Sequence, residues 1–331
     1  MSAPPMDGYD RRIDYLRISV TDRCNLRCRY CMPAEGVWKL GHEEVLRYEE
    51  IMRLAAIAVR MGISKIRITG GEPLVRKDIL YLCANISRLE GLKSLSVTTN
   101  GVLLGEYAEK LFSAGIRRLN ISLDTLKPER FFQITRVDCF QQVWEGILAA
   151  QRVGISPIKL NAVILRGTND DEIEDLARLT VDHPFHVRFI ELMPFRPQEE
   201  HSPSEFVSSD EILERLSGIA PLQPAAGPEG NGPAVHFRLP GALGTIGIIS
   251  PITHHFCAKC NRLRLTADGK LRTCLFASEE TDLRQLLRNG ATDASIMETI
   301  RKAILSKPER HSLERPFSRK CISRPMFAIG G

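Results

Sequence analysis

The chain has 331 residues, a formal net charge of +5, 43% hydrophobic residues and 26% charged residues. This length fits one large α/β domain with an appendage, and the composition is ordinary for a soluble globular protein. No apolar run approaches the roughly 18 residues that a membrane span needs, and the N-terminal segment MSAPPMDGYDRRIDY has no apolar signal core. We therefore expect a cytoplasmic protein that is neither secreted nor bound to a membrane.

The positive charge is concentrated near the C-terminus. Residues 301–324 contain eight Lys or Arg and two Glu, so this stretch alone carries a local charge of +6 and the rest of the chain is nearly neutral. We interpret this stretch as a solvated basic tail and predict no nucleic-acid partner.

Strand-like and helical runs alternate from the N-terminus. Residues 14–20 read as a strand, 48–62 as a helix and 64–71 as the next strand, and the alternation continues to the strand HVRFIEL at 186–192. About six β/α units result, which indicates parallel strands joined by right-handed crossovers. Neither GxGxxG nor a P-loop follows the first strand, which disfavours a simple dinucleotide-binding or nucleotide-hydrolysing fold.

Five of these strands alternate between an apolar and a polar face. A closed eight-stranded barrel fills its interior with bulky apolar side chains, so a polar inner face predicts an incomplete (β/α)6 TIM-like barrel around a large, wet and cationic cavity. The sixth strand, HVRFIEL, does not separate into one polar face and one apolar face. The polar faces comprise Arg17 and Ser19; Lys65, Arg67 and Thr69; Ser94, Ser96 and Thr98; Asn120, Ser122 and Asp124; and Lys159 and Asn161.

The character of the sequence changes after about residue 195. A polar, Pro- and Ser-containing connection follows, then short strands and turn clusters. We predict a barrel domain over 1–195 and a smaller C-terminal α+β domain over 196–331.

A hairpin is predicted around Asp268-Gly269, where two alternating runs meet at a favoured turn dipeptide. If Ala267 opposes Lys270, then Cys274 opposes Leu263. The hairpin then brings Cys274 close to the point where Cys257 and Cys260 enter.

The nine cysteines, an odd and clustered set, indicate metal ligation in a reducing compartment. They include two trios, Cys24-x3-Cys28-x2-Cys31 and Cys257-x2-Cys260-x13-Cys274. Structural zinc prefers four ligands, and each trio supplies only three cysteines. His254 or His255 could complete a zinc site at the second trio, which remains an alternative there. For the first trio, an iron–sulfur cluster with one open iron fits better.

The first trio, placed just after the first strand, resembles the signature of the radical S-adenosylmethionine (SAM) superfamily. The segment GGEP at 70–73 resembles that superfamily's SAM-binding segment. The second trio, the sequence Arg262-Leu263-Arg264 and the ending Gly330-Gly331 narrow the resemblance. Over essentially the whole chain, the sequence resembles the GTP 3′,8-cyclase family of molybdenum cofactor biosynthesis.

This resemblance implies a role for each matching position. Cys24, Cys28 and Cys31 would hold one [4Fe–4S] cluster, and Cys257, Cys260 and Cys274 a second cluster whose open iron meets the guanine. The residues implied to contact SAM are Tyr30, Gly71, Ser122 and Met193. The residues implied to bind GTP are Arg17, Arg67, Thr98, Lys159, Arg262, Leu263 and Arg264, of which Arg17, Arg262 and Arg264 are also implied in catalysis.

The activity implied is reductive cleavage of SAM, hydrogen abstraction from C3′ of GTP and bond formation between C3′ and C8. The product would be (8S)-3′,8-cyclo-7,8-dihydroguanosine 5′-triphosphate, handed to cyclic pyranopterin monophosphate synthase. A Gly-Gly terminus has no side chains to keep it out of such a cavity. The resemblance also suggests a homodimer, and it identifies no electron donor.

Two other functions stay open from the sequence. One is a radical SAM enzyme acting on another substrate such as a peptide, although such enzymes usually carry more cysteines after the barrel. The other is a non-enzymatic zinc-ribbon protein that binds nucleic acid. We expect ordinary structural roles for the remaining cysteines, Cys83, Cys139 and Cys321.

Overall fold

The computed structural model describes residues 3–36, 39–195, 203–228, 232–311 and 324–330. Six strands alternate with helices and pair in parallel, in chain order. The strands are β1 (Tyr15–Ser19), β2 (Lys65–Thr69), β3 (Ser94–Thr99), β4 (Arg118–Ser122), β5 (Ile158–Ile164) and β6 (His186–Glu191). The helices between and after them are α1 (Tyr48–Arg60), α2 (Ile79–Ser87), α3 (Leu104–Ser113), α4 (Pro128–Thr135), α5 (Phe140–Arg152), α6 (Ile173–Asp182) and α7 (Ser209–Ser217). Short 3-10 turns lie at η1 (Pro73–Val75), η2 (Asp170–Glu172), η3 (Pro203–Glu205) and η4 (Cys257–Lys259).

The C-terminal part extends this sheet at both edges. Strand β9 (Thr245–Ile249) pairs in parallel with β6, and β10 (Arg262–Leu265) pairs in parallel with β1. Antiparallel strands continue outward on each side: β8 (Val235–Arg238) and β7 (Gln223–Pro224) beyond β9, and β11 (Lys270–Arg272) and β12 (Thr281–Asp282) beyond β10. Within the described residues, β12 and β7 therefore form the outer edges of one open sheet. The predicted fold class, an incomplete barrel with a smaller C-terminal part, is confirmed, and the boundary at residue 195 stays a prediction.

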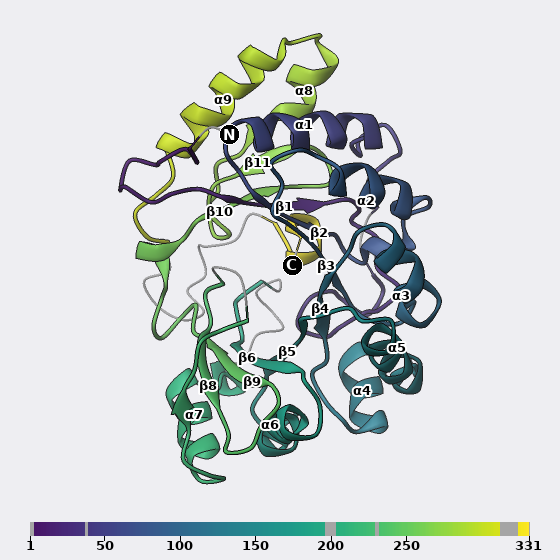
Figure 1. The fold of residues 1–331 in the computed structure, drawn as a ribbon, viewed down its shortest axis with the longest axis vertical. Coiled ribbons are helices and arrows are strands. Elements are labelled where there is room, and N and C mark those ends of the chain that lie inside the picture. Colours follow the sequence, from purple (N-terminus) through teal and green to yellow (C-terminus); the bar gives the residue numbers. More distant parts are fainter. Residues whose placement is uncertain (1–2, 37–38, 196–202, 229–231, 312–323, 331) are drawn as a thin grey trace.

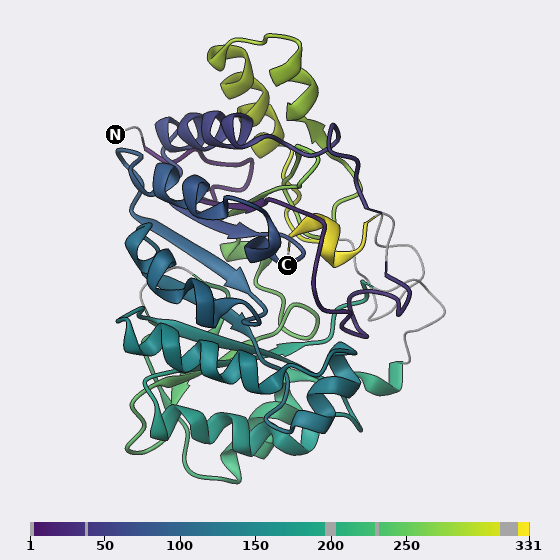
Figure 2. The ribbon, with the colours of Figure 1, turned by 90° about the vertical axis from the view of Figure 1, so that its right-hand side faces the viewer.

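Helices cover the outside of the curved sheet, and the C-terminal end of the chain lies inside it (Figures 1 and 2). The last helices are α8 (Leu283–Arg288) and α9 (Asp293–Leu305), which pack over the β10–β11 edge, and α10 (Met326–Ile329), which enters the interior. None of the helices in the described part of the chain is both long and apolar enough to cross a membrane.

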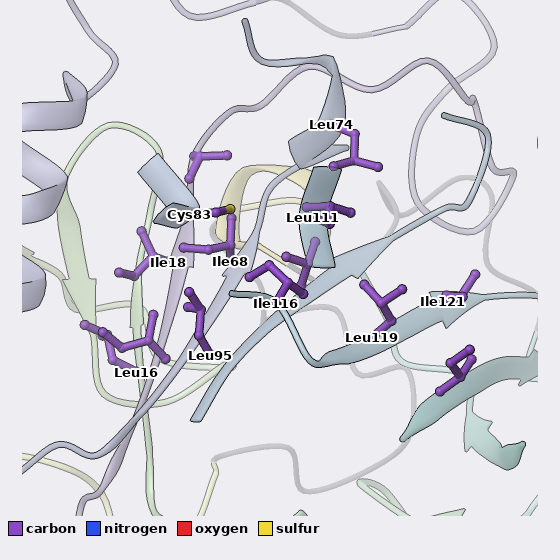
Figure 3. Close-up of a cluster of buried hydrophobic side chains, with 14 of the residues drawn as sticks. Leu16, Ile18, Ile68, Leu74, Cys83, Leu95, Leu111, Ile116, Leu119 and Ile121 are labelled. Carbon is purple, nitrogen blue, oxygen red and sulfur yellow. The ribbon is translucent and has the colours of Figure 1, made fainter. Parts of the chain in front are cut away.

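The hydrophobic core lies between the strands and the outer helices, as alternation predicts. Figure 3 shows its members, which include Leu16, Ile18, Ile68, Leu95, Leu119 and Ile121 from the strands. Cys83 on α2 is fully buried in this core, and Cys139 is buried at the start of α5. These two cysteines pack as ordinary apolar residues, whereas Cys321 and Gly331 lie outside the described residues.

The turn of the β10–β11 hairpin differs from the prediction. Thr266 N donates to Lys270 O over 2.9 Å, and Gly269, between them, has φ +79°. The loop therefore has three residues and ends in a left-handed glycine, which is the usual geometry of a three-residue hairpin loop. The prediction that Ala267 opposes Lys270 is wrong by one position.

This shift changes the face on which the third cysteine of the second trio lies. Arg264 pairs with Arg272, and the same register continued past β11 places Cys274 opposite Arg262 instead of Leu263. Residues opposite each other share a face of the sheet. Cys274 consequently lies with the arginines on the cavity face, and Leu263 lies on the core face.

Candidate active site

A cavity of about 330 Å³ opens at the centre of the barrel, and both cysteine trios line it. Of the site residues predicted from the sequence, all but Lys159 and Leu263 contribute to its wall. Those that do are Arg17, Cys24, Cys28, Tyr30, Cys31, Arg67, Gly71, Thr98, Ser122, Met193, Cys257, Cys260, Arg262, Arg264 and Cys274. The fold thus brings together residues from positions 17 to 274 in one cavity.

The loop that carries the first trio is held by backbone hydrogen bonds. Cys28 O accepts from the amides of Cys31 and Met32, both at 2.9 Å. Gly71 N donates to Thr21 O at 2.7 Å, and a Cβ at Gly71 would lie 2.3 Å from Arg23 O. Only glycine permits this contact, so the GGEP segment positions the cysteine loop through its backbone.

The chemistry of the first trio fits an iron–sulfur cluster. Burial raises the pKa of Cys24, and it raises the pKa of Cys28 well above the usual range. Buried thiols of this kind bind metal as thiolates only when the metal itself supplies positive charge. Among the described residues, no group of three His, Cys, Asp or Glu side chains is arranged around a single metal ion. A zinc site held by three cysteines would be one ligand short, whereas three cysteines can hold an iron–sulfur cluster that leaves one iron open.

Two buried cations donate hydrogen bonds to backbone carbonyls around the second trio. Arg11 donates to Cys257 O at 2.9 Å, and Lys307 Nζ donates to Arg262 O at 3.0 Å. Although burial opposes ionisation, Arg262 and Lys307 lower the pKa of Cys260 to about 6. A thiolate is therefore favoured at this sulfur, as cluster ligation requires.

The histidines considered for zinc at the second trio have other partners. His254 Nε2 lies 2.8 Å from Asp210 Oδ1, and the ring of His255 packs edge-on against His311 with the centroids 5.4 Å apart. His255 lines the cavity, whereas His254 does not. The arrangement gives no support to a zinc site completed by His254.

The floor of the cavity is cationic and has unused donors. Within the described part of the chain, Nε of Arg17, Arg67 and Arg188 and Oγ1 of Thr98 are buried without a hydrogen-bond partner. Burial and the neighbouring Arg67 lower the pKa of Arg17 to about 9, and burial lowers that of Arg188 to about 10. Leaving such groups unsatisfied is costly, so the pocket is suited to a highly charged anion that guanidinium groups recognise.

Lys159 and Leu263 lie away from the cavity wall. Lys159 shares the inner face of β5 with Asn161, which lines the cavity, and is two positions nearer the start of the strand. The Lys159 side chain makes no ion pair with any residue that the structure describes, so no internal acid compensates its charge there. The Leu263 side chain is 1% exposed in the apolar core, which limits any substrate contact to its backbone.

Arg188 and Tyr15 were missed from the sequence. Arg188 is 5% exposed, lines the cavity from β6 and donates to Asn120 Oδ1 at 3.3 Å. Period-two alternation from His186 would have placed it inward, but the mixed strand HVRFIEL obscured the pattern. Tyr15 shares the inner face with Arg17, and the Arg67 guanidinium lies 5.4 Å from its ring centroid.

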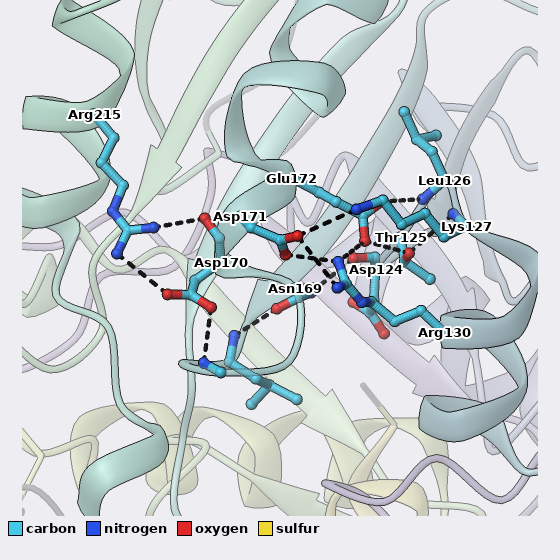
Figure 4. Close-up of polar contacts among 12 residues, drawn as sticks. Asp124, Thr125, Leu126, Lys127, Arg130, Asn169, Asp170, Asp171, Glu172 and Arg215 are labelled. Atoms are coloured by element: carbon cyan, nitrogen blue, oxygen red, sulfur yellow. Dashed lines mark hydrogen bonds and ion pairs between the residues drawn. The ribbon is translucent and has the colours of Figure 1, made fainter.

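Asp124 was assigned only to the polar face, and the structure gives it a definite contact. Its Oδ2 accepts from the Tyr30 hydroxyl at 2.7 Å, and its Oδ1 accepts from Val163 N at 2.8 Å. Asn169 Nδ2 donates to the Asp124 carbonyl at 2.7 Å, within a wider polar network around buried Glu172 (Figure 4). Burial raises the pKa of Asp124 to about 6. The network fixes the loop after β4 and, through Tyr30, one wall beside the first trio.

The C-terminal tail enters the cavity. Ile329 forms a small apolar cluster with Phe195 and Phe276, next to Met193 and Cys274. A Cβ at Gly330 would lie 2.3 Å from Thr69 Oγ1, and this glycine has φ +81°. The end of the tail therefore requires glycine where it meets the carboxyl ends of the inner strands.

Two family models match the chain, one over each part. The model described as the radical SAM superfamily matches residues 18–180, and that described as Molybdenum Cofactor Synthesis C matches residues 185–313. Curated relatives match almost end to end. A protein named GTP 3′,8-cyclase from Peptoclostridium acidaminophilum is 52% identical over 98% of each chain.

The chain belongs to the GTP 3′,8-cyclase family. A second member, from Moorella thermoacetica, is 50% identical over 98% of this chain and 99% of its own. As a GTP 3′,8-cyclase family member, the chain is a radical SAM enzyme, and SAM and an iron–sulfur cluster are the cofactors of that superfamily. The resemblance inferred from the two cysteine trios is confirmed.

Solved structures of other proteins share the fold of this chain. The crystal structure of Streptococcus suis SuiB aligns with a TM-score of 0.64 at 16% identity, covering 91% of this chain and 68% of that chain. SuiB bound to S-adenosylmethionine aligns with a TM-score of 0.61 at 16% identity, covering 86% and 67%. At this identity the likeness shows the shared fold alone.

Proposed function

We propose that the protein converts GTP to (8S)-3′,8-cyclo-7,8-dihydroguanosine 5′-triphosphate, an early step of molybdenum cofactor biosynthesis. The observation that carries the proposal is the meeting, in one cavity, of two cysteine trios and three buried arginines whose Nε donors are unpaired. The naming of the curated relatives supports the same activity.

SAM is assigned to the side of the cavity formed by the first trio. Cys24, Cys28 and Cys31 would hold a [4Fe–4S] cluster with one open iron, which can bind the amino acid part of SAM. Of the residues assigned to SAM, Tyr30 is fixed by Asp124 at 2.7 Å. The other residues assigned to SAM are Gly71, Ser122 and Met193, which line the same cavity.

GTP is assigned to the floor of the cavity and to the second trio. Arg17, Arg67 and Arg188 line the cavity and would face the triphosphate, whose oxygens would accept from their unpaired Nε donors. Lys159, two positions nearer the start of β5 than the lining residue Asn161, is assigned to GTP by the family resemblance. Arg262 and Arg264 extend this cationic wall toward the second trio. Cys257, Cys260 and Cys274 would hold a second cluster, whose open iron would meet the guanine and so fix the base relative to the ribose.

When bound, the cluster and SAM would supply the hydrogen abstraction at C3′ of GTP that permits the C3′–C8 bond to form, and one further electron, from the unidentified donor, and one proton would complete the dihydro product. The protein's own part is to orient the ribose and base and to exclude water. Arg17 and Arg264 are register partners on the adjacent strands β1 and β10 and line the same cavity as both trios, which suits them to hold the substrate during ring closure. Met326 and Phe327 of the tail line the same cavity.

Three further assignments follow from the family and stay proposals. They are a homodimer, transfer of the product to cyclic pyranopterin monophosphate synthase, and an electron donor still to be identified. A peptide substrate is the competing proposal, and the unpaired arginine donors of the cavity favour an anion over it.

The number of clusters and the need for GTP are tested together. Anaerobically reconstituted protein should hold about eight irons, as two [4Fe–4S] clusters require. With dithionite and SAM, it should form 5′-deoxyadenosine faster when GTP is added. An iron content of about four per chain would contradict the second cluster. A rate of 5′-deoxyadenosine formation that does not change when GTP is added would favour another substrate.

A further inference from the structure

The carboxylate of Glu72 is enclosed by protein donors. Its side chain is 1% exposed. Its Oε1 accepts from Leu74 N at 3.0 Å and from Thr99 Oγ1 at 2.8 Å, and its Oε2 accepts from Asn100 N at 2.6 Å. Both oxygens are therefore used within the protein, and the carboxylate fixes the backbone at the end of β3.

Asn100, which Glu72 holds by its backbone, reaches the first trio with its side chain. Its Nδ2 lies 3.7 Å from Cys24 Sγ and 2.8 Å from Asn25 Oδ1. Its Oδ1 accepts from Val102 N at 3.1 Å. Because a backbone N–H can only donate, this contact fixes which end of the amide faces the sulfur. The NH2 group, a donor, points to Cys24.

A second donor meets the same sulfur. Leu26 N lies 3.4 Å from Cys24 Sγ. N–H donors to a cluster sulfur stabilise the more negative, reduced form and so raise its reduction potential. The side-chain donor differs from the backbone donor in that substitution can remove it.

We propose that Asn100 tunes the reduction potential of the first cluster through its N–H···S contact with Cys24, with Glu72 as the positioning residue for Asn100. The inference rests on the proposed cluster at Cys24, Cys28 and Cys31, and it does not depend on the identity of the substrate. Asn100 thereby favours uptake of the electron that the reaction needs.

Substitution of Asn100 tests the proposal in the full-length reconstituted protein. Asn100→Ala removes the donor, and Asn100→Asp replaces it with a carboxylate of the same shape. We expect the midpoint potential of the SAM-responsive cluster, followed by EPR in a redox titration, to fall in Asn100→Ala and to fall further in Asn100→Asp. Asn85→Asp is the matched control, because Asn85 Nδ2 donates to Tyr81 O in an exposed contact within helix α2, and the potential of this variant should equal that of the wild type. Unchanged potentials in both Asn100 variants would overturn the proposal.

A measurement on the unmutated protein avoids variants that fail to fold. With asparagine labelled by ¹⁵N in the side-chain amide, HYSCORE of the reduced cluster should show a ¹⁵N coupling. Its absence would overturn the contact. In Glu72→Gln, where one carboxylate oxygen becomes an NH2 group, the coupling should weaken, and an unchanged coupling would remove the positioning role. A protein that shows no cluster signal at all would instead contradict the proposed function.

Discussion

Arg264 donates a hydrogen bond to the backbone carbonyl of Gly330, so the end of the chain is tied to β10 inside the barrel. The same hairpin holds the start of the described tail. Arg324 forms a bidentate pair with Asp268, with both N–O distances at 2.9 Å. One hairpin therefore anchors both ends of residues 324–330, close to the second trio.

Loss of the Arg324–Asp268 pair should make residues 326–330 more mobile. In Arg324→Gln we expect faster hydrogen exchange over residues 326–330 and a loss of about tenfold in turnover, since a charge-assisted bidentate pair contributes roughly 1.5–3 kcal/mol. Arg301→Gln is the control, because Arg301 pairs with Glu298 over 3.9 Å in an exposed contact. Equal exchange in Arg324→Gln and wild type would contradict the anchoring role.

Arg188 should contribute to binding of the triphosphate. Arg188→Gln is expected to weaken GTP binding by roughly 10- to 100-fold, the effect of removing one charge-assisted contact, and to affect guanosine little. Calorimetric titration of both ligands measures this difference. Arg238→Gln, which loses a contact to Ala242 O near the sheet edge, should bind GTP normally. An equal loss for guanosine and GTP would place Arg188 at the nucleoside instead.

Lys159 should make the stability of the free protein depend on pH. Burial, with repulsion from Arg188, Arg67 and Arg118, lowers the pKa of Lys159 to about 6. Because the unfolded chain binds the proton up to its ordinary pKa of about 10.4, this residue makes stability rise with pH between the two values, by at most about 1.4 kcal/mol per pH unit. Lys159→Met should therefore raise the free energy of unfolding more at pH 7 than at pH 9. A gain that is the same at both pH values would contradict this.

The same residue should couple GTP binding to a proton. The negative triphosphate restores the positive charge of Lys159, so GTP binding at pH 8 should take up about one proton. Calorimetry in buffers with different heats of ionisation measures the uptake. Lys159→Met should abolish it, and an unchanged uptake in that variant would assign the proton elsewhere.

The two trios should lose iron independently. Cys24→Ala and Cys257→Ala should each remove about four irons. Cys83→Ala is the control, because Cys83 is buried in the core between α2 and the sheet. Iron analysis after anaerobic reconstitution distinguishes these cases. Full iron content in Cys257→Ala would contradict a second cluster at that trio.

The sequence was informative where one periodicity dominated. The inner faces of β1 to β5 were predictable because apolar and polar residues alternate cleanly, and Arg17, Arg67, Thr98 and Ser122 line the cavity as expected. The cysteine spacing predicted both trios. The pairing of β9 with β6 and of β10 with β1 could not be predicted, since such pairing joins strands more than 50 residues apart.

Other features of the site depend on structural details that the pattern of polar and apolar residues does not contain. The register of Cys274 changed because the hairpin loop has three residues instead of two, which a single Asp-Gly signal does not decide. Arg188 was missed because β6 carries His186 and Glu191 among apolar residues, and neither face looks uniform. The contact of Asn100 with Cys24 depends on a buried carboxylate, Glu72, from a different strand end.

The most direct test of the account is turnover of the reconstituted protein with dithionite, SAM and GTP deuterated at C3′, followed by mass spectrometry of the 5′-deoxyadenosine. The account predicts deuterium in that product, because the hydrogen atom removed comes from C3′ of GTP. Unlabelled 5′-deoxyadenosine, formed at the same rate with and without GTP, would contradict it.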